Sequence, residues 1–267
     1  MPSAARALVM SATLWAPLAD GRMEAQRPDV ERWRSVARRA IYFGHQSVGY
    51  NIAAGLERLS GELSLGLKLV ETYEPSAILQ PAFVHFRAGR NMDPASKNAA
   101  MLRMLESRPR ADRAIVLLKY CYVDIDRRTD VNAVFAGYQA MVRTIRTRYP
   151  DVTIVHSTVP LTTVESSAKA RAKELLGRPS LRQDAIARQR YNELVRAAYA
   201  HREPLFDIAR IESGYRRTPV GFDANGKRVE TLALEYTTDG GHLNERGQEL
   251  VAKELLSVLA RVAETGG

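Results

Sequence analysis

Short apolar runs alternate along most of the chain with longer segments of helical periodicity. The apolar runs are rich in β-branched and aromatic residues and lie at residues 40–44, 65–71, 114–123, 152–159 and 204–208, with a shorter one at 83–86. Runs of this kind are typical of strands buried on both faces of a parallel sheet. The segments between them space their apolar residues as helices do, at residues 50–63, 94–107, 131–149, 181–201 and 244–262.

This alternation predicts an α/β fold, a mainly parallel sheet of about five strands with helices on both faces. Residues 31–267 contain no internal repeat and no low-complexity linker, which favours a single domain over that range. Residues 212–241 form the longest stretch without a predicted element. A loop of that length inside a compact domain is usually functional.

The first 30 residues are predicted to be a leader outside the fold. Arg6 and the apolar residues 7–19 resemble a short signal sequence, although no Ala-x-Ala cleavage site follows. A disordered leader is the alternative. A signal sequence would place the protein in the periplasm or outside the cell, with the cytoplasm as the alternative. No apolar run reaches the roughly 18 residues that cross a bilayer, so no stable membrane span is expected.

The composition limits the classes of partner and cofactor that we expect. The 267 residues include 39 Lys and Arg against 30 Asp and Glu, a formal net charge of +9. The basic residues are scattered and interleaved with acidic ones, so we expect no nucleic-acid partner. One cysteine, Cys121, excludes an internal disulfide and a zinc site of several thiolates, and the histidines are dispersed. We therefore expect neither a metal nor a cofactor.

The candidate chemistry follows the first and last predicted strands, because ligands of open α/β sheets bind beyond the carboxyl ends of the strands. After the first strand, Ser47 occupies a tight turn that leads into a helix, which exposes a hydroxyl beside helical amides. Near the end of the chain, Asp239 and His242 lie three residues apart across a Gly-Gly turn. A serine nucleophile needs a base and a carboxylate that orients it. The alternatives are that Ser47 only caps the helix and that Asp239 belongs to a surface turn.

Two blocks of the sequence resemble the SGNH/GDSL hydrolase superfamily. They are residues 43–49, followed by a helix, and the ending Asp239-Gly240-Gly241-His242-Leu243-Asn244 with Gly247. The resemblance implies a flavodoxin-like, three-layer α/β/α sandwich. It also implies a catalytic triad of Ser47, Asp239 and His242. In that superfamily the oxyanion hole combines the serine amide, a glycine amide of the second block and an asparagine side chain of the third. Here these donors would include the amides of Ser47 and Gly89.

The sequence departs from that pattern at two blocks. Gly44-His45-Gln46-Ser47 replaces Gly-Asp-Ser, and residues 119–124 stand where Gly-x-Asn-Asp is expected. Asn91 is the first candidate for the missing oxyanion donor, and Lys119 and Tyr122 are the alternatives. The candidate residues of a substrate pocket are His45, Lys119, Tyr122 and Asp124. For Lys119 and Asp124 the alternative is a buried ion pair.

The resemblance predicts a serine esterase that removes an acetyl or another short acyl group from a carbohydrate or a small ester, because the superfamily includes many sugar deacetylases. One alternative is an acyltransferase that uses the same triad. Another is a non-catalytic carbohydrate-binding protein on the same fold, which the altered first and third blocks favour.

Overall fold

The computed structural model describes residues 29–78, 81–109, 113–164, 181–214, 217–224 and 226–265. Within them, six strands form one sheet in the order β2-β3-β1-β4-β5-β6, and every pairing in it is parallel. The strands are β1 Ile41–His45, β2 Leu69–Glu71, β3 Phe83–Arg87, β4 Ile115–Leu118, β5 Thr153–Ser157 and β6 Leu205–Phe206. The predicted signal-like residues 4–19 lie outside the described residues, so the leader stays a prediction.

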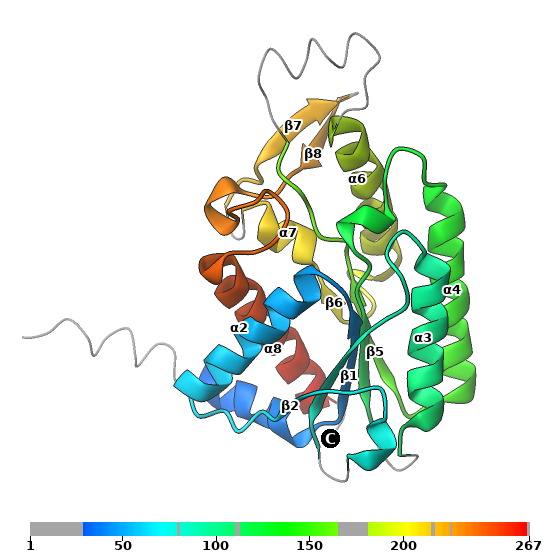
Figure 1. Ribbon diagram of the computed structural model, residues 1–267, viewed down its shortest axis with the longest axis vertical. Coiled ribbons are helices and arrows are strands. Elements are labelled where there is room, and N and C mark those ends of the chain that lie inside the picture. Colours follow the sequence, from blue (N-terminus) through cyan, green and yellow to red (C-terminus); the bar gives the residue numbers. More distant parts are fainter. Residues whose placement is uncertain are drawn as a thin grey trace, which may run out of the picture.

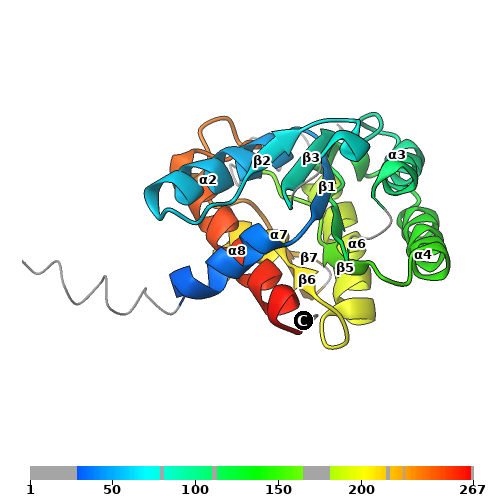
Figure 2. The same cartoon turned by 90° about the horizontal axis from the view of Figure 1, so that it is seen from below.

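Helices cover both faces of this sheet. The helices are α2 Val48–Glu62, α3 Pro94–Ser107, α4 Val131–Arg148, α6 Leu181–Tyr199, α7 Ile208–Glu212 and α8 Glu245–Thr265. Figures 1 and 2 show α2 and α8 together on one side of the sheet and α3 and α4 on the other. The predicted three-layer α/β/α architecture is thus confirmed. None of the helices in the described ranges is long and apolar enough to cross a membrane.

Two apolar cores follow from the alternation of side chains along the strands. Phe43 and Phe83 pack on the side of α2, α7 and α8, whereas their neighbours Tyr42 and Val84 pack on the side of α3, α4 and α6. All five residues of β1 are buried. A strand covered on both faces needs this continuous apolar pattern, which is the pattern that made β1 recognisable in the sequence.

The structure corrects three details of the predicted elements. The optional run at 83–86 is β3, a full strand between β2 and β1, so the sheet has six strands rather than about five. Strand β4 ends at Leu118, because the chain then turns into the 3₁₀ helix η3 Tyr122–Asp124. Residues 212–241 are not structureless, since they contain the antiparallel hairpin of β7 Gly221–Ala224 and β8 Lys227–Glu230.

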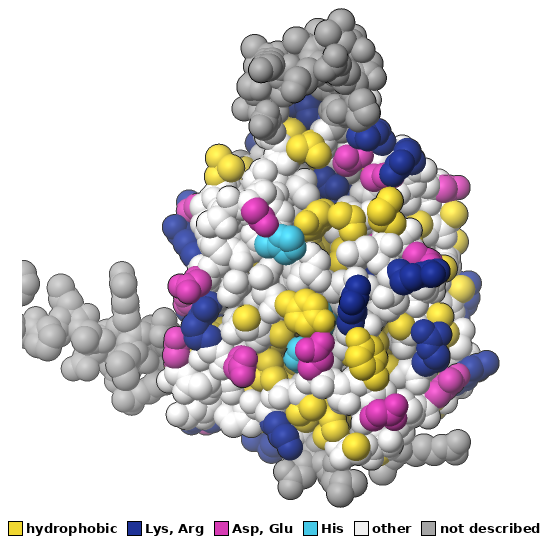
Figure 3. All heavy atoms as spheres, viewed as in Figure 1, with side chains coloured by type: hydrophobic (Ala, Val, Ile, Leu, Met, Phe, Trp, Pro, Cys, Tyr) yellow, Lys and Arg dark blue, Asp and Glu magenta, His cyan; other side chains and the backbone are white. Residues whose placement is uncertain are grey.

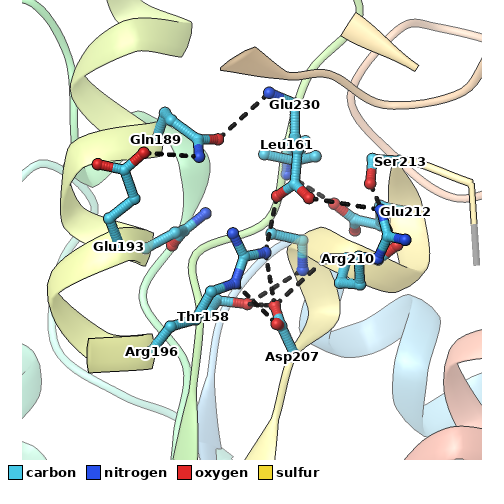
Figure 4. Close-up of polar contacts among 12 residues, drawn as sticks. Thr158, Leu161, Gln189, Glu193, Arg196, Asp207, Arg210, Glu212, Ser213 and Glu230 are labelled. Carbon is cyan, nitrogen blue, oxygen red and sulfur yellow. Dashed lines mark hydrogen bonds and ion pairs between the residues drawn. The ribbon is translucent and has the colours of Figure 1, made fainter. Parts of the chain in front are cut away.

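A polar network fastens this hairpin to the sandwich (Figure 4). Arg196 of α6 donates two hydrogen bonds, of 2.7 and 2.9 Å, to the carboxylate of Asp207 and a third, of 2.7 Å, to Glu230 of β8. Asp207 also caps α7 by accepting from the amide of Arg210. Charged groups that are paired in this way hold an irregular segment in place where it has little apolar area to bury.

Glu212, at the end of α7, is a buried carboxyl group with a single hydrogen-bonded oxygen. The amide of Leu161 donates to its Oε2 at 2.6 Å, whereas Oε1 has no hydrogen-bond partner among the described residues. Burial raises the pKa of Glu212 to about 8, against the opposing effects of that amide and of Lys119 and Arg188. The folded protein therefore keeps a proton here that the unfolded chain releases at lower pH.

The stability of the fold should consequently fall as the pH rises from about 4.5 to about 8, because the folded state binds more protons than the unfolded state within that window. Glu212→Gln removes this titration. Between pH 5 and pH 8, the free energy of unfolding of this variant, measured by urea denaturation, should rise by roughly a few kcal/mol relative to that of the wild type. The exposed Glu62→Gln is the matched control. Parallel curves for Glu212→Gln and wild type would contradict the prediction.

The close packing of α2 on α8 depends on Gly55. A Cβ atom built on Gly55 would lie 2.5 Å from the carbonyl oxygen of Gln248 and 3.0 Å from the Cβ of Ala252. A Cβ built on Gly61 of the same helix would meet nothing within 4 Å. The two glycines therefore separate the effect of packing from the effect of helix propensity.

We expect Gly55→Ala to lower the free energy of unfolding by about 1–3 kcal/mol, because the two helices must move apart. Gly61→Ala should raise it by up to about 1 kcal/mol, since alanine restricts the unfolded chain. Urea unfolding of both variants measures the contrast. Equal stability of the two would show that α2 and α8 accommodate the extra atom freely.

Candidate active site

Ser47 occupies the turn that joins β1 to α2, and its backbone is strained. Its φ of 51° and ψ of −112° lie in a region that residues other than glycine rarely adopt. Ser47 stands at the N-cap position, yet its side chain makes no capping hydrogen bond. The turn therefore presents the hydroxyl instead of using it for the helix.

The hydroxyl of Ser47 meets a histidine from the other end of the chain. Ser47 Oγ lies 2.7 Å from Nε2 of His242, and Nδ1 of His242 lies 2.7 Å from Oδ2 of Asp239. With Nδ1 carrying the proton that Asp239 accepts, Nε2 is free to accept the proton of Ser47. The structure thus brings the three predicted triad residues together in the expected order. The side chains of His242 and Asp239 remain 46% and 54% exposed.

The turn of residues 239–242 is built to hold that carboxylate. Oδ1 of Asp239 accepts hydrogen bonds from the amides of Gly241, at 2.9 Å, and of His242, at 2.7 Å. These backbone amides are the main reason why the pKa of Asp239 is held well below its usual range. Gly240 has a φ of 87°, and a Cβ there would lie 2.6 Å from Oγ1 of Thr163. A side chain at Gly240 would therefore disturb the orientation of Asp239.

The side chains of Lys119 and Gln46 hold the Ser47 turn in place. The ammonium of Lys119 is fully buried and donates to the carbonyl oxygen of Gln46 at 3.1 Å. The amide of the Gln46 side chain donates to the carbonyl oxygens of Ala88 at 2.9 Å and of Gly89 at 2.6 Å. Gln46 therefore ties the loop after β1 to the loop after β3.

Gly89, the predicted second oxyanion donor, lies in that tied loop. Its φ is 54°, and a Cβ there would come within 2.5 Å of the amide nitrogen of Lys97 in α3. Within the described part of the chain, neither the amide of Ser47 nor that of Gly89 donates a hydrogen bond to a backbone carbonyl oxygen. Gln46 holds the loops of these two amides together, and two amides fixed in this way are suited to stabilise a developing negative charge by hydrogen bonds.

Asn91 is engaged elsewhere in the same loop. Its Oδ1 accepts a hydrogen bond from Nζ of Lys97 at 3.2 Å. Lys97 is also paired with Asp124, and this ion pair is fully buried. Asp124 accepts from the amides of Met92 and Cys121 as well, at 2.7 and 2.6 Å. Among the described contacts none joins Asn91 to Ser47.

The predicted substrate pocket needs correction at three of its four residues. His45, Lys119 and Asp124 are 0%, 0% and 3% exposed, and they lie beneath the site instead of lining it. The ring of His45 packs over Gly49 and pairs with Nδ1 of His85 at 3.0 Å, and burial lowers its pKa to about 2. The predicted alternative of a buried ion pair describes Asp124, although its partner is Lys97 and not Lys119.

Tyr122, the fourth pocket residue, does reach the triad. Its ring stands edge-to-face with the ring of His242, with centroids 6.2 Å apart, and its hydroxyl lies beside Gly241. A Cβ on Gly241 would lie 3.0 Å from that hydroxyl. Gly241 thus leaves room for Tyr122 beside His242.

A family comparison agrees with this geometry. The profile of the GDSL-like Lipase/Acylhydrolase family matches residues 71–250, more than half of the chain. The chain belongs to the GDSL-like lipase/acylhydrolase family. The match includes Asp239 and His242 but begins after Ser47, consistent with the divergent first block of this GDSL-like chain. Membership supports ester hydrolysis as the general class of activity.

Solved structures resemble this GDSL-like chain only distantly. A Streptococcus pneumonia protein provisionally described as a platelet activating factor has 16% identity over 91% of this chain and 96% of its own, with a TM-score of 0.47. The Clostridium thermocellum family 3 carbohydrate esterase has 14% identity over 85% and 97%, with a TM-score of 0.44. The periplasmic domain of a Salmonella ser. Paratyphi A lipopolysaccharide acetyltransferase has 9% identity over 89% and 96%, with a TM-score of 0.45. No curated protein matches the chain.

Sequence reasoning missed the roles of Gln46 and of Arg188 in this GDSL-like site. Gln46 directly precedes the serine, where the family has aspartate, and that substitution was the available signal. Arg188 lies within α6 and donates to the carbonyl oxygen of Tyr122 at 3.3 Å. Nothing in the periodicity of α6 distinguishes Arg188 from the other arginines of that helix.

We expect Gln46→Ala to lower kcat for 4-nitrophenyl acetate by about 10-fold or more, because the Gly89 amide loses its fixed position relative to Ser47. Hydrogen exchange in residues 88–91, followed by mass spectrometry, should accelerate. The control is Gln189→Ala, which removes another buried amide with two hydrogen bonds far along the chain. It should reduce stability and leave kcat per folded molecule unchanged. Similar kinetic losses in both variants would argue against a specific role of Gln46.

Proposed function

We propose that the protein is a serine esterase that removes acetyl or another short acyl group from a carbohydrate or a small ester. The observation that carries this proposal is the unbroken line of contacts from Ser47 Oγ to His242 Nε2, and from His242 Nδ1 to Asp239, at 2.7 Å each. Two distances of this length, on a hydroxyl that its own turn does not use, are the arrangement of an activated nucleophile.

In the proposed reaction, Ser47 Oγ attacks the ester carbonyl while its proton passes to Nε2 of His242. Asp239 keeps the imidazole in the required tautomer and stabilises the positive charge that forms on it. The amides of Ser47 and Gly89 donate hydrogen bonds to the oxyanion. Collapse of the intermediate releases the alcohol, which takes the proton from His242, and water then cleaves the acyl-enzyme by the same steps.

The surface around the triad supports an ester with a bulky alcohol part. Half-exposed His242 and Asp239 leave the site open to the solvent. An exposed apolar side chain follows each of Ser47, Gly89 and Tyr122 along the chain: Tyr50 in the first turn of α2, Met92 in the loop after β3, and Val123 in η3. Figure 3 shows a band of hydrophobic side chains on this face beside an exposed histidine. Such a surface suits the apolar face of a sugar ring.

We predict that Ser47→Ala and His242→Ala each lower kcat/KM for 4-nitrophenyl acetate by several orders of magnitude, and that the double variant is little worse than either one. Members of a triad act as one unit, so their losses do not add. Steady-state kinetics of the three variants measure this, with circular dichroism to show that they fold. Additive losses would contradict a shared mechanism, and unchanged turnover in Ser47→Ala would favour a non-catalytic binding protein.

A further inference from the structure

Three donors converge on the carbonyl oxygen of Gln46, directly before the nucleophile. This oxygen accepts hydrogen bonds from the amide of Gly49 at 3.0 Å, from Nζ of Lys119 at 3.1 Å and from the thiol of Cys121 at 3.4 Å. A carbonyl oxygen has two lone pairs, so three donors exceed its usual share. The Gly49 amide closes the turn between β1 and α2, and the amine of Lys119 is a further donor that such a turn does not require.

Lys119 makes this contact without an ion pair. Its side chain is fully buried, and within the described residues its hydrogen bonds go to the carbonyl oxygens of Gln46 and Tyr120 and to the sulfur of Cys121, and none goes to a carboxylate. Burying an amine without a carboxylate partner lowers the stability of a fold relative to an apolar side chain of the same length. The stability of the sandwich therefore gives no reason for a lysine at this position.

The contact with Lys119 fixes the direction of the Ser47 amide. The carbonyl group of Gln46 and the N–H group of Ser47 belong to one trans peptide, in which the two groups point in opposite directions. Because the carbonyl oxygen faces the buried amine, the amide hydrogen faces away from it. Within the described part of the chain this amide donates to no backbone carbonyl oxygen, and Oγ of the same residue lies 2.7 Å from Nε2 of His242. The amide is thus held beside the hydroxyl that would attack a substrate.

We propose that Lys119 is a positioning residue, which holds the peptide between Gln46 and Ser47 so that the Ser47 amide donates to the oxyanion. This inference rests on the proposed esterase function. When Oγ of Ser47 bonds to the ester carbonyl carbon, its proton passes to Nε2 of His242 and the carbonyl π electrons move to the carbonyl oxygen. The Ser47 amide donates a hydrogen bond to that oxygen and keeps its proton. Lys119 lies on the opposite side of the peptide and touches no reacting atom.

A hydrogen bond to the Gln46 carbonyl oxygen acts on the Ser47 amide in two ways. It fixes the orientation of the amide before the reaction, so the donor need not be reorganised when the negative charge develops. Linked hydrogen bonds also polarise one another, so a donor at the carbonyl oxygen strengthens donation by the N–H group of the same peptide. Both effects pass through the peptide, which is consistent with the full burial of Lys119. They differ from the role of a direct oxyanion donor, for which Lys119 would have to reach the substrate.

The first test compares Lys119→Met with Cys121→Ala. Both side chains are fully buried and contact the same carbonyl oxygen, but the lysine donates from nitrogen and the cysteine from sulfur. Lys119→Met should lower kcat for 4-nitrophenyl acetate by about 10- to 100-fold, with KM within about threefold of the wild type. It should weaken the binding of phenylboronic acid, which binds serine as a tetrahedral anion, by about the same factor as kcat. Cys121→Ala should change each quantity by less than about threefold, because a thiol is a weak donor.

The second test observes the peptide itself by NMR. The dipeptide Gln-Ser occurs once in the sequence, so isotope labelling of glutamine carbonyl carbons and serine nitrogens yields a single signal, that of the peptide between Gln46 and Ser47. Phenylboronic acid should move the Ser47 amide proton downfield in the wild type and in Cys121→Ala, because the amide then donates to the tetrahedral anion. The shift should be much smaller in Lys119→Met.

The outcomes separate this positioning role from a structural role of Lys119. Wild-type kcat and wild-type phenylboronic acid affinity in Lys119→Met would overturn the proposal, and so would equal losses in Cys121→Ala, which would reflect packing around Gln46. A Ser47 amide proton that does not move when phenylboronic acid binds the wild type would also overturn it, whether or not Lys119→Met folds. If the wild type neither hydrolyses the ester nor binds phenylboronic acid, the esterase function itself fails, and the role of Lys119 fails with it.

Discussion

The candidate site depends on the hydrogen bond that the buried side chain of Lys119 donates to the strained turn at Ser47. Ser47 can present its hydroxyl only because its backbone adopts a conformation with positive φ, and such a residue costs about 1–3 kcal/mol unless its surroundings over-determine it. The hydrogen bond from the fully buried Lys119 to the carbonyl oxygen of Gln46 supplies that restraint from inside the sheet. Burial lowers the pKa of Lys119, because the amine has given up its hydration in this position.

The parallel sheet makes the other restraints possible. Because β3, β1 and β4 are neighbours and run in the same direction, the loops that carry Gly89, Ser47 and Tyr122 emerge side by side. Side chains tie these loops together. Gln46 joins the loop after β1 to the loop after β3, and Asp124 joins the loops after β3 and β4 through the amides of Met92 and Cys121. His242 lies on a separate segment, the turn before α8, and Asn51 of α2 accepts a hydrogen bond from the amide of the adjacent Leu243.

The sequence predicted the layers of the fold and the two ends of the site because these depend on local patterns. The helical spacing placed α3 at its observed bounds, and the Asp-Gly-Gly-His turn was recognisable because both its carboxylate contacts and its Asn244 cap lie within a few residues. The partners of Lys119 and Asp124 were not predictable in this way. Their contacts with Gln46 and Lys97 join loops whose proximity depends on the strand order, and the position of β3 between β2 and β1 makes that order.

The three candidate triad residues are partly exposed, whereas the side chains that position them are buried. This difference explains why the divergent sequence blocks are compatible with the proposed ester hydrolysis. In the proposed function the groups that act on a substrate are Ser47, His242 and Asp239, and the two contacts that join them are 2.7 Å each. The groups that maintain those distances are buried and therefore must be paired, because an unpaired buried charge is costly. Replacing the family's aspartate by Gln46 is tolerable on these terms, since a carboxylate facing the carbonyl oxygens of Ala88 and Gly89 could not donate to them, whereas the amide donates to both. The first block has diverged in sequence, and in this chain Gln46 joins the loop of Ser47 to the loop of Gly89.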